Sequence, residues 1–221
     1  MTTNGDIVNL AQWLSPAFPV GGFAYSHGLE TAIQGGTISR VGDLQDWLCD
    51  VLEYGSGRND SILLRAAYAC TSPAQIEEVN QTAIAVSASR ERVFETQQQG
   101  TAFAQTVASI WGGGEMQDAN SAALCYPVAV GYAATRAQFD VDLTATMYLH
   151  AFASNLVSAA VRAVPLGQTE GQRVLAALIP VCEQIVQRTV GTTLDDLSST
   201  AFLSDIAAMQ HETLQPRIFR S

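Results

Sequence analysis

A histidine and a glutamate three positions apart, His27 and Glu30, are the first residues whose spacing suggests chemistry. Side chains three apart lie on one face of a helix, where an imidazole and a carboxylate could hold a metal ion or relay a proton. Two ligands are too few for a tight metal site, and the neighbouring sequence supplies no third. The spacing therefore favours a polar surface or interface pair. The alternative is a small enzyme that uses a pocket of His27, Glu30 and Tyr25.

The other two of the three histidines suggest less. His150 lies in the most apolar stretch of the chain and is predicted to be a hydrogen-bonded core residue. His211 is followed by Glu212, but the second histidine of an HExxH zinc motif is missing. Neither a G-x-S-x-G elbow nor a recognisable cysteine–histidine motif occurs, so serine or cysteine hydrolysis has little support.

Charge and composition exclude several classes of function. The net charge is −10 and only 11 side chains are basic, so the basic patch of a nucleic-acid-binding protein is missing, and binding to anionic lipid is disfavoured. All the basic residues are arginines, which excludes a Schiff-base lysine and the lysine of a phosphate-binding loop. Charged residues make up 14% of the chain, against about 25% in ordinary soluble domains. This deficit predicts a large core or a surface covered by a partner.

The four cysteines predict a reducing environment. Cys49, Cys70, Cys125 and Cys182 form no CxxC motif, so neither a zinc knuckle nor a thioredoxin-type site is expected. With no secretory signal at the start of the sequence, we expect buried, reduced thiols in a cytoplasmic protein. The uncharged stretch between Asp142 and Arg162 is nominally long enough for a membrane, but its polar and alanine residues favour a buried helix.

The elements that must position these residues are predicted to be helices only. No stretch alternates polar and apolar residues as a strand would. Residues 1–221 are predicted to form one all-α domain, a bundle of about nine or ten helices. Gly100 is predicted to interrupt one helix, Gly112 to Gly114 to be a flexible joint, and a T-x-x-D box at Thr193 to begin the last helix. The predicted helices span residues 7–14, 23–34, 44–54, 60–70, 73–111, 119–138, 143–164, 169–188 and 193–211.

Residues 15–30, SPAFPVGGFAYSHGLE, are unusual for a simple connection. Pro16 and Pro19 fix their backbone angles and remove amide donors, so no regular helix crosses them. Gly21 and Gly22 can adopt backbone angles closed to other residues, or allow another backbone to come close. A chain that stiffens, turns and restarts with few charges builds a specific surface, although an ordinary interhelical connection is the simpler interpretation.

Two later stretches share this character. Arg162 to Arg173 reads RAVPLGQTEGQR, with Pro165 and Gly167 between two helices and neutral amides at Gln168 and Gln172. It is a capped interhelical turn, or a surface that contacts a partner.

The sequence from Met209 onward, MQHETLQPRIFRS, reads as a polar tail with one aromatic anchor. Phe219 is flanked by Arg217 and Arg220, and an apolar anchor beside guanidinium groups is a common interface composition.

These three stretches together resemble the UreF family of urease accessory proteins. The first resembles the N-terminal signature of that family, VPLGQTEGQRVL resembles its characteristic turn, and the tail resembles its close, a His-Glu pair followed by Arg-Leu-Phe-x-Ser, with Ile218 here in place of the leucine. Residues 39–149 support the resemblance only through length and helix content.

The resemblance implies an all-α homodimer that is not itself an enzyme. It would bind the UreD-type accessory protein, also called UreH, recruit the nickel-carrying GTPase UreG, and so serve nickel insertion into apo-urease. Nickel would be handled by the assembled complex, with no cofactor or metal bound stably by this chain. A variant of this function modulates the GTP cycle of UreG, and Arg162 and Arg173 would be the first arginines to test.

Transferred residue by residue, the resemblance predicts partner-binding positions rather than catalytic ones. The tail, residues 210–221, would order on UreD, the PLGQ turn would lie near the face that accepts UreG, and residues 21–30 would support a partner surface or a path for nickel. The predicted partner-binding residues are Gly22, Phe23, Tyr25, Ser26, Glu30, Arg162, Pro165, Leu166, Gly167, Gln168, Gln172, His211, Glu212, Arg217, Phe219 and Arg220.

Overall fold

Side-chain caps begin several helices of the computed structural model, which describes residues 2–112, 123–164 and 166–221. Thr3, Ser72, Ser89 and Asp140 each accept an amide hydrogen from the first turn that follows, which satisfies a donor that the helix itself cannot. Pro73 occupies the first position of its helix, where its missing amide costs nothing.

The described residues form helices and connections, and the predicted all-α fold is confirmed. The α-helices are α1 (Asn4–Trp13), α2 (Leu29–Gln34), α3 (Val41–Tyr54), α4 (Ser56–Ala69), α5 (Pro73–Ala85), α6 (Arg90–Trp111), α8 (Tyr126–Arg136), α9 (Val141–Ala163), α10 (Gln168–Arg188) and α11 (Phe202–His211), with 3₁₀ turns η1 (Gly22–Ala24) and η3 (Leu194–Asp196).

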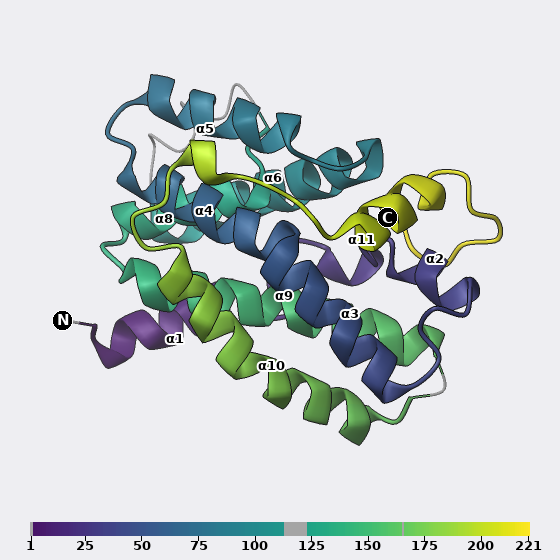
Figure 1. Ribbon diagram of the computed structural model, residues 1–221. Helices are drawn as coiled ribbons and strands as arrows, with labels where there is room; N and C mark the ends of the chain where they lie inside the picture. Colours follow the sequence, from purple (N-terminus) through teal and green to yellow (C-terminus); the bar gives the residue numbers. More distant parts are fainter. Residues whose placement is uncertain (1, 113–122, 165) are drawn as a thin grey trace.

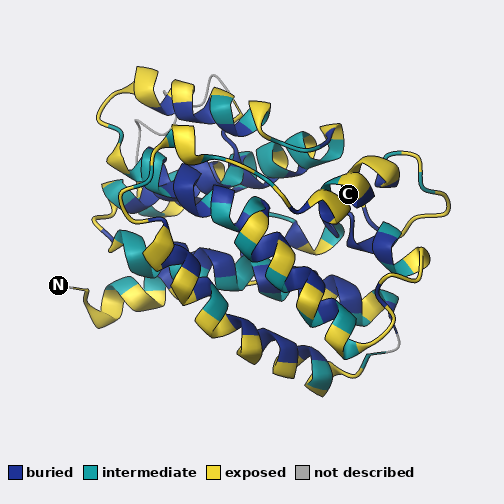
Figure 2. Cartoon of the chain, in the orientation of Figure 1, coloured by how far each residue is buried: buried dark blue, intermediate teal, exposed yellow. Residues whose placement is uncertain are grey.

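Helix α8 is the centre of the bundle. Its residues from Pro127 to Ala134 are all buried, and α4, α6 and α5 pack around it. Helices α9, α10 and α3 form a neighbouring group, and the short helices α2 and α11 pair beside the C-terminal residues (Figure 1). The buried sides of the long helices face one another (Figure 2), as amphipathic helices around one core must.

Two glycines allow the central helices to come close. A side chain at Gly131 of α8 would place its Cβ 2.2 Å from the carbonyl oxygen of Leu64 in α4. At Gly100 of α6 the Cβ would lie 2.0 Å from the carbonyl oxygen of Leu124. The sequence predicted that Gly100 would interrupt a helix, but α6 is unbroken there. Gly100 instead lets the backbone at Leu124 pack directly against α6. The interruption lies instead between α5 and α6.

An aromatic cluster anchors the N-terminal helix. Trp13 is 1% exposed, and its ring centroid lies 5.5 Å from that of Phe103, 5.6 Å from that of Trp111 and 5.0 Å from that of Phe139. Phe18, from the proline-rich segment, also packs on Phe103. Residues 15–22 are thus fixed to α6 before the chain turns toward α2.

The predicted helix over residues 23–34 was wrong in its first half. The chain forms only η1, and then His27 and Gly28 take positive φ angles of 58° and 77° before α2 begins. Gly28 sits directly against α11, because a Cβ there would lie 2.6 Å from the amide nitrogen of Ala208. Close approach of two backbones, rather than helix propensity, decides the local conformation.

Other predicted boundaries also differ. Helix α4 begins at Ser56, earlier than the predicted start at residue 60. The capping box at Thr193 begins only the 3₁₀ turn η3, and the last helix begins later, at Phe202. Gly113, Gly114 and residues 119–122 fall outside the described residues.

Candidate functional site

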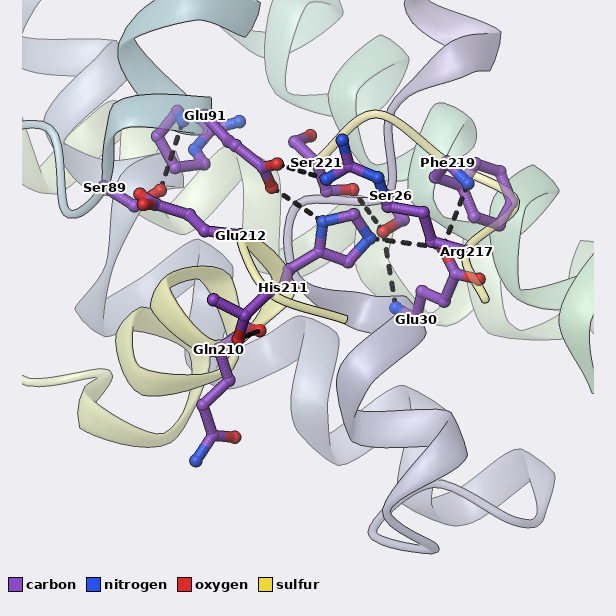
Figure 3. A network of polar contacts seen from close by, with 12 residues as sticks. Ser26, Glu30, Ser89, Glu91, Gln210, His211, Glu212, Arg217, Phe219 and Ser221 are labelled. Atoms are coloured by element: carbon purple, nitrogen blue, oxygen red, sulfur yellow. Dashed lines mark hydrogen bonds and ion pairs between the residues drawn. The ribbon is translucent and has the colours of Figure 1, made fainter. Parts of the chain in front are cut away.

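The C-terminal tail folds back onto residues 24–30, and Glu30 is the centre of this contact (Figure 3). The backbone amide of Ile218 donates to Glu30 Oε1 at 2.7 Å, and that of Phe219 donates to Oε2 at 3.0 Å. Burial alone would raise the pKa of Glu30, but these two amides and His211 outweigh it, and the pKa is lowered. An ionised carboxylate that accepts two successive amides fixes the register of the tail.

His211, at the end of α11, lies between two carboxylates. Its Nε2 is 3.2 Å from Glu30 Oε2, and its Nδ1 is 2.7 Å from Glu91 Oε2. Glu91 also accepts a hydrogen bond from Arg217, so α2, α6 and the tail meet at one point (Figure 3). His211 is 0% exposed, which places the whole imidazole inside the protein.

The last residues are held by a second carboxylate of α6. Ser221 Oγ donates to Glu95 Oε2 at 2.6 Å, and Glu95 pairs with Arg92 in a buried ion pair. Ser26 donates its backbone amide to the Ser221 carbonyl at 2.8 Å and its hydroxyl to the same oxygen. The amide of Arg220 donates to the Ala24 carbonyl at 2.8 Å. We call Glu30, Glu91 and Glu95 the tail cradle.

Arg162 connects the second sequence stretch to the first and third. Its Nη2 donates to the carbonyl oxygen of Phe23 at 2.7 Å, and its guanidinium lies 4.7 Å from the centre of the Phe219 ring. Phe219 itself is 3% exposed, so the aromatic anchor that was predicted to bind a partner is buried within this chain instead. Arg162 therefore has a structural role at this junction.

The outer side of this junction is exposed and mixed in character. Phe23 is 68% exposed and Ile218 is 72% exposed, and Arg217 and Arg220 are also exposed. Tyr25 is buried, and its side chain hydrogen-bonds to Arg220. Two apolar side chains among guanidinium groups have the composition of an interface, in a protein whose net charge is otherwise strongly negative. We call Phe23, Arg217, Ile218 and Arg220 the junction surface.

Most of the PLGQ turn is separate from these contacts. Gly167, Gln168 and Gln172 are exposed at the start of α10, where Glu170 accepts the amide of Gly167 at 2.8 Å. Leu166 packs against the core. Pro165 lies outside the described residues. The turn is thus a capped helix start, as its simpler interpretation predicted, with its amide side chains facing outward.

His27 and Glu30 do not share a helix face, which removes the basis of the predicted enzyme pocket. His27 lies before α2, and its Nε2 is 2.7 Å from Ser56 Oγ, whereas Glu30 faces the tail. His27 lines a cavity of about 160 Å³ with Asp60 and Arg92. Burial first and Arg92 second hold the pKa of His27 well below its usual value, and burial raises that of Asp60 to about 6.

The prediction that His150 is a hydrogen-bonded core residue was wrong. His150 is half-buried and lines an apolar groove of about 410 Å³ with Met147, Ile179 and Cys182. No hydrogen bond joins it to a described residue. Two of the four thiols, Cys125 and Cys182, are buried as predicted, and burial raises the pKa of each to about 12; Cys49 and Cys70 are half-buried.

The sequence alone gave no reason to choose Glu91 and Glu95. They stand one turn apart in α6, among other polar helix formers. One signal could have found these two glutamates. His211 and Arg217 require carboxylate partners, and few acidic residues lie on a helix as long as α6. Within the described ranges no group of three His, Cys, Asp or Glu side chains could hold a metal ion. No described helix is long and apolar enough to cross a membrane.

Comparison with known proteins decides the family. The UreF family model matches residues 38–179. A urease accessory protein UreF from Ruegeria pomeroyi is 48% identical over 219 residues, which covers 99% of this chain and 98% of the relative. The UreF of Roseobacter denitrificans is 50% identical over 214 residues, 97% of this chain and 93% of the relative, and that of Cereibacter sphaeroides strain KD131 is 47% identical over 215 residues, 97% and 98%. The chain belongs to the UreF family.

Membership in the UreF family confirms the resemblance drawn from three short stretches. The family model also covers the middle of the chain, where the sequence showed no motif of the family. The relatives are named as urease accessory proteins, and the prediction that this UreF-family chain is not itself an enzyme is confirmed by those names.

Proposed function

We propose that this UreF-family chain is a scaffold for nickel insertion into apo-urease. It acts in the cytoplasm as a homodimer, binds a UreD/UreH-type accessory protein, and recruits the GTPase UreG. Nickel passes through the assembled complex as cargo. The chain is strongly acidic, and its described residues hold no cluster of three His, Cys, Asp or Glu, which supports transient passage of a cation better than storage.

The observation that carries this proposal is the junction surface. Three sequence stretches that are far apart meet there through Arg162, which contacts Phe23 and Phe219. Their buried members hold the tail, while Phe23 and Ile218 remain exposed. Apolar side chains flanked by arginines have the composition of a protein interface. The exposed guanidinium groups of Arg217 and Arg220 would favour an acidic patch on the partner.

The test is co-purification of the chain with UreD and UreG from the same source. Ile218→Asp changes only an exposed side chain, because Ile218 is held through its backbone amide. We expect this variant, Phe23→Ala, and a chain ending at Met209 to lose the ternary complex.

The matched control is Val8→Asp on α1, which is 65% exposed and lies outside the junction surface. It should leave the complex intact. Retention of both partners by Ile218→Asp and Phe23→Ala would contradict the proposed surface, and failure of the unmodified chain to bind either partner would contradict the scaffold function.

Modulation of the GTP cycle of UreG is a second candidate function. Of the two arginines considered for it, Arg173 is the better candidate. Arg162 is occupied by Phe23 and Phe219, whereas Arg173 is exposed on α10 and has no partner among the described residues. GTP hydrolysis by the complex should fall with Arg173→Ala and be unchanged with Arg188→Ala, an arginine at the far end of the same helix. Equal rates for both variants would remove this candidate.

A further inference from the structure

His211 occupies a position that a neutral imidazole satisfies poorly. A neutral ring has one N–H donor and one lone pair, whereas the protonated ring donates from both nitrogens. Carboxylate oxygens face both nitrogens of His211, at 2.7 Å from Nδ1 and 3.2 Å from Nε2. With a neutral ring, one carboxylate would meet a lone pair in a fully buried site, which is costly.

The charges around His211 balance only if the ring is protonated. Glu30 faces it from α2 and Glu91 from α6, and Arg217 from the tail contacts Glu91. Two carboxylates are then matched by one guanidinium and one imidazolium. Gln34 adds a neutral donor to Glu30 at 3.3 Å. At the rim, Arg90 and Glu212 pair with each other and add no net charge.

The same two carboxylates fix the tail. Glu30 holds the amides of Ile218 and Phe219, and Glu91 holds the side chain of Arg217. Loss of the imidazolium would leave Glu30 and Glu91 with one cation between them and would weaken their shared orientation. Because the tail is attached largely through these polar groups and one aromatic ring, it can detach without unfolding the helices around α8.

We propose that His211 is the positioning residue of the tail: as an imidazolium bridging Glu30 and Glu91, it holds residues 217–221 in the register that forms the junction surface. The link to partner binding rests on the proposed function. The docking of the tail in the free chain does not.

Two measurements on the free chain test the proposal. The first is the ¹⁵N NMR signature of the His211 ring, assigned with the help of His27→Gln and His150→Gln, since the chain has three histidines. We expect both ring nitrogens to carry protons in the folded chain. A ring with one bare nitrogen would overturn the proposal, and this readout needs no destabilising variant.

The second measurement is the hydrogen-exchange protection factor of the amides of Ile218, Phe219 and Arg220 in the unmodified chain and in His211→Gln. The glutamine side chain has one nitrogen where the imidazole has two, so it cannot place donors where both ring nitrogens lie. We expect tail protection to fall about tenfold or more in this variant, while the amides of α8 stay protected. His150→Gln, a half-buried histidine in the apolar groove, should behave like the unmodified chain.

The outcomes separate this inference from the scaffold function. Tail protection that is equal in His211→Gln and the unmodified chain would refute the role of His211 even if UreD and UreG still bind. Protection that falls as expected in His211→Gln, while the unmodified chain binds neither partner, would support the role of His211 and refute the scaffold function.

Discussion

The helical core around α8 and the tail cradle are held together by opposite means. In the core, Gly131 lets α8 touch the backbone of α4, and the contacts are apolar and close. In the cradle, three carboxylates hold a peptide through amides, an imidazole and a guanidinium. Close apolar packing responds to volume and hardly to pH, whereas buried ion pairs respond to the loss of any one charge. The molecule thus joins a fixed body to a segment that can be released.

The largest effect should come from filling the glycine contact of the core. Gly131→Ala would place a Cβ 2.2 Å from the Leu64 carbonyl oxygen, which neither backbone can relieve easily. We expect a loss of about 3 kcal/mol in the free energy of unfolding, measured with urea. Gly42→Ala is the control, because nothing lies within 4 Å of its Cβ, and it should be neutral or slightly stabilising. A stable Gly131→Ala protein would show that the two helices can separate.

Glu30→Ala should affect the other region. It leaves the amides of Ile218 and Phe219 and the Nε2 atom of His211 without their acceptor. We expect the docked tail to lose about 2 kcal/mol, seen as faster hydrogen exchange of those amides and faster proteolysis after Arg217. Exchange in α8 should be unchanged. If α8 and the tail loosened together, the two regions would be one cooperative unit and the comparison would fail.

Acid should act on the two regions with opposite sign. Asp60, beside the core, has a pKa raised to about 6 by burial, so its ionisation costs stability above that pH, and the cost disappears as pH falls toward 4. We expect Asp60 to contribute on the order of 1 kcal/mol between pH 7 and pH 5, measured as the difference between the unmodified chain and Asp60→Asn, because His27, with its lowered pKa, acts with the opposite sign over the same range. Glu30 has a lowered pKa, so its contribution persists to below about pH 4 and is then lost. Urea titrations and tail protection over this range would check both signs.

The smallest effect should come from the rim of the cradle. The Arg90 side chain is 91% exposed where it pairs with Glu212, and water screens such a pair. Arg90→Ala should leave both the unfolding curve and the tail protection unchanged within error. A marked loss would mean that the cradle extends to the surface and is not confined to its buried carboxylates.

The sequence predicted the fold class well because helix periodicity and capping are local. Ser72 and Pro73 begin α5 as their types require. Predictions failed where distant backbone decides, as at His27 and Gly28, whose positive φ angles follow from contact with α11. The motifs marked Glu30, His211 and Phe219 as important, but their mutual contact spans most of the chain and no spacing rule could reveal it.

The reach of the tail has a consequence for the order of folding. Ser26 and Ser221 meet across a sequence separation of 195 residues, and Glu30 and His211 across 181. Contacts of such separation close the longest loops in the chain and form only after local helices have paired. We therefore expect docking of the tail to be the last kinetic phase of refolding, and release of the tail to be the first step when the protein unfolds.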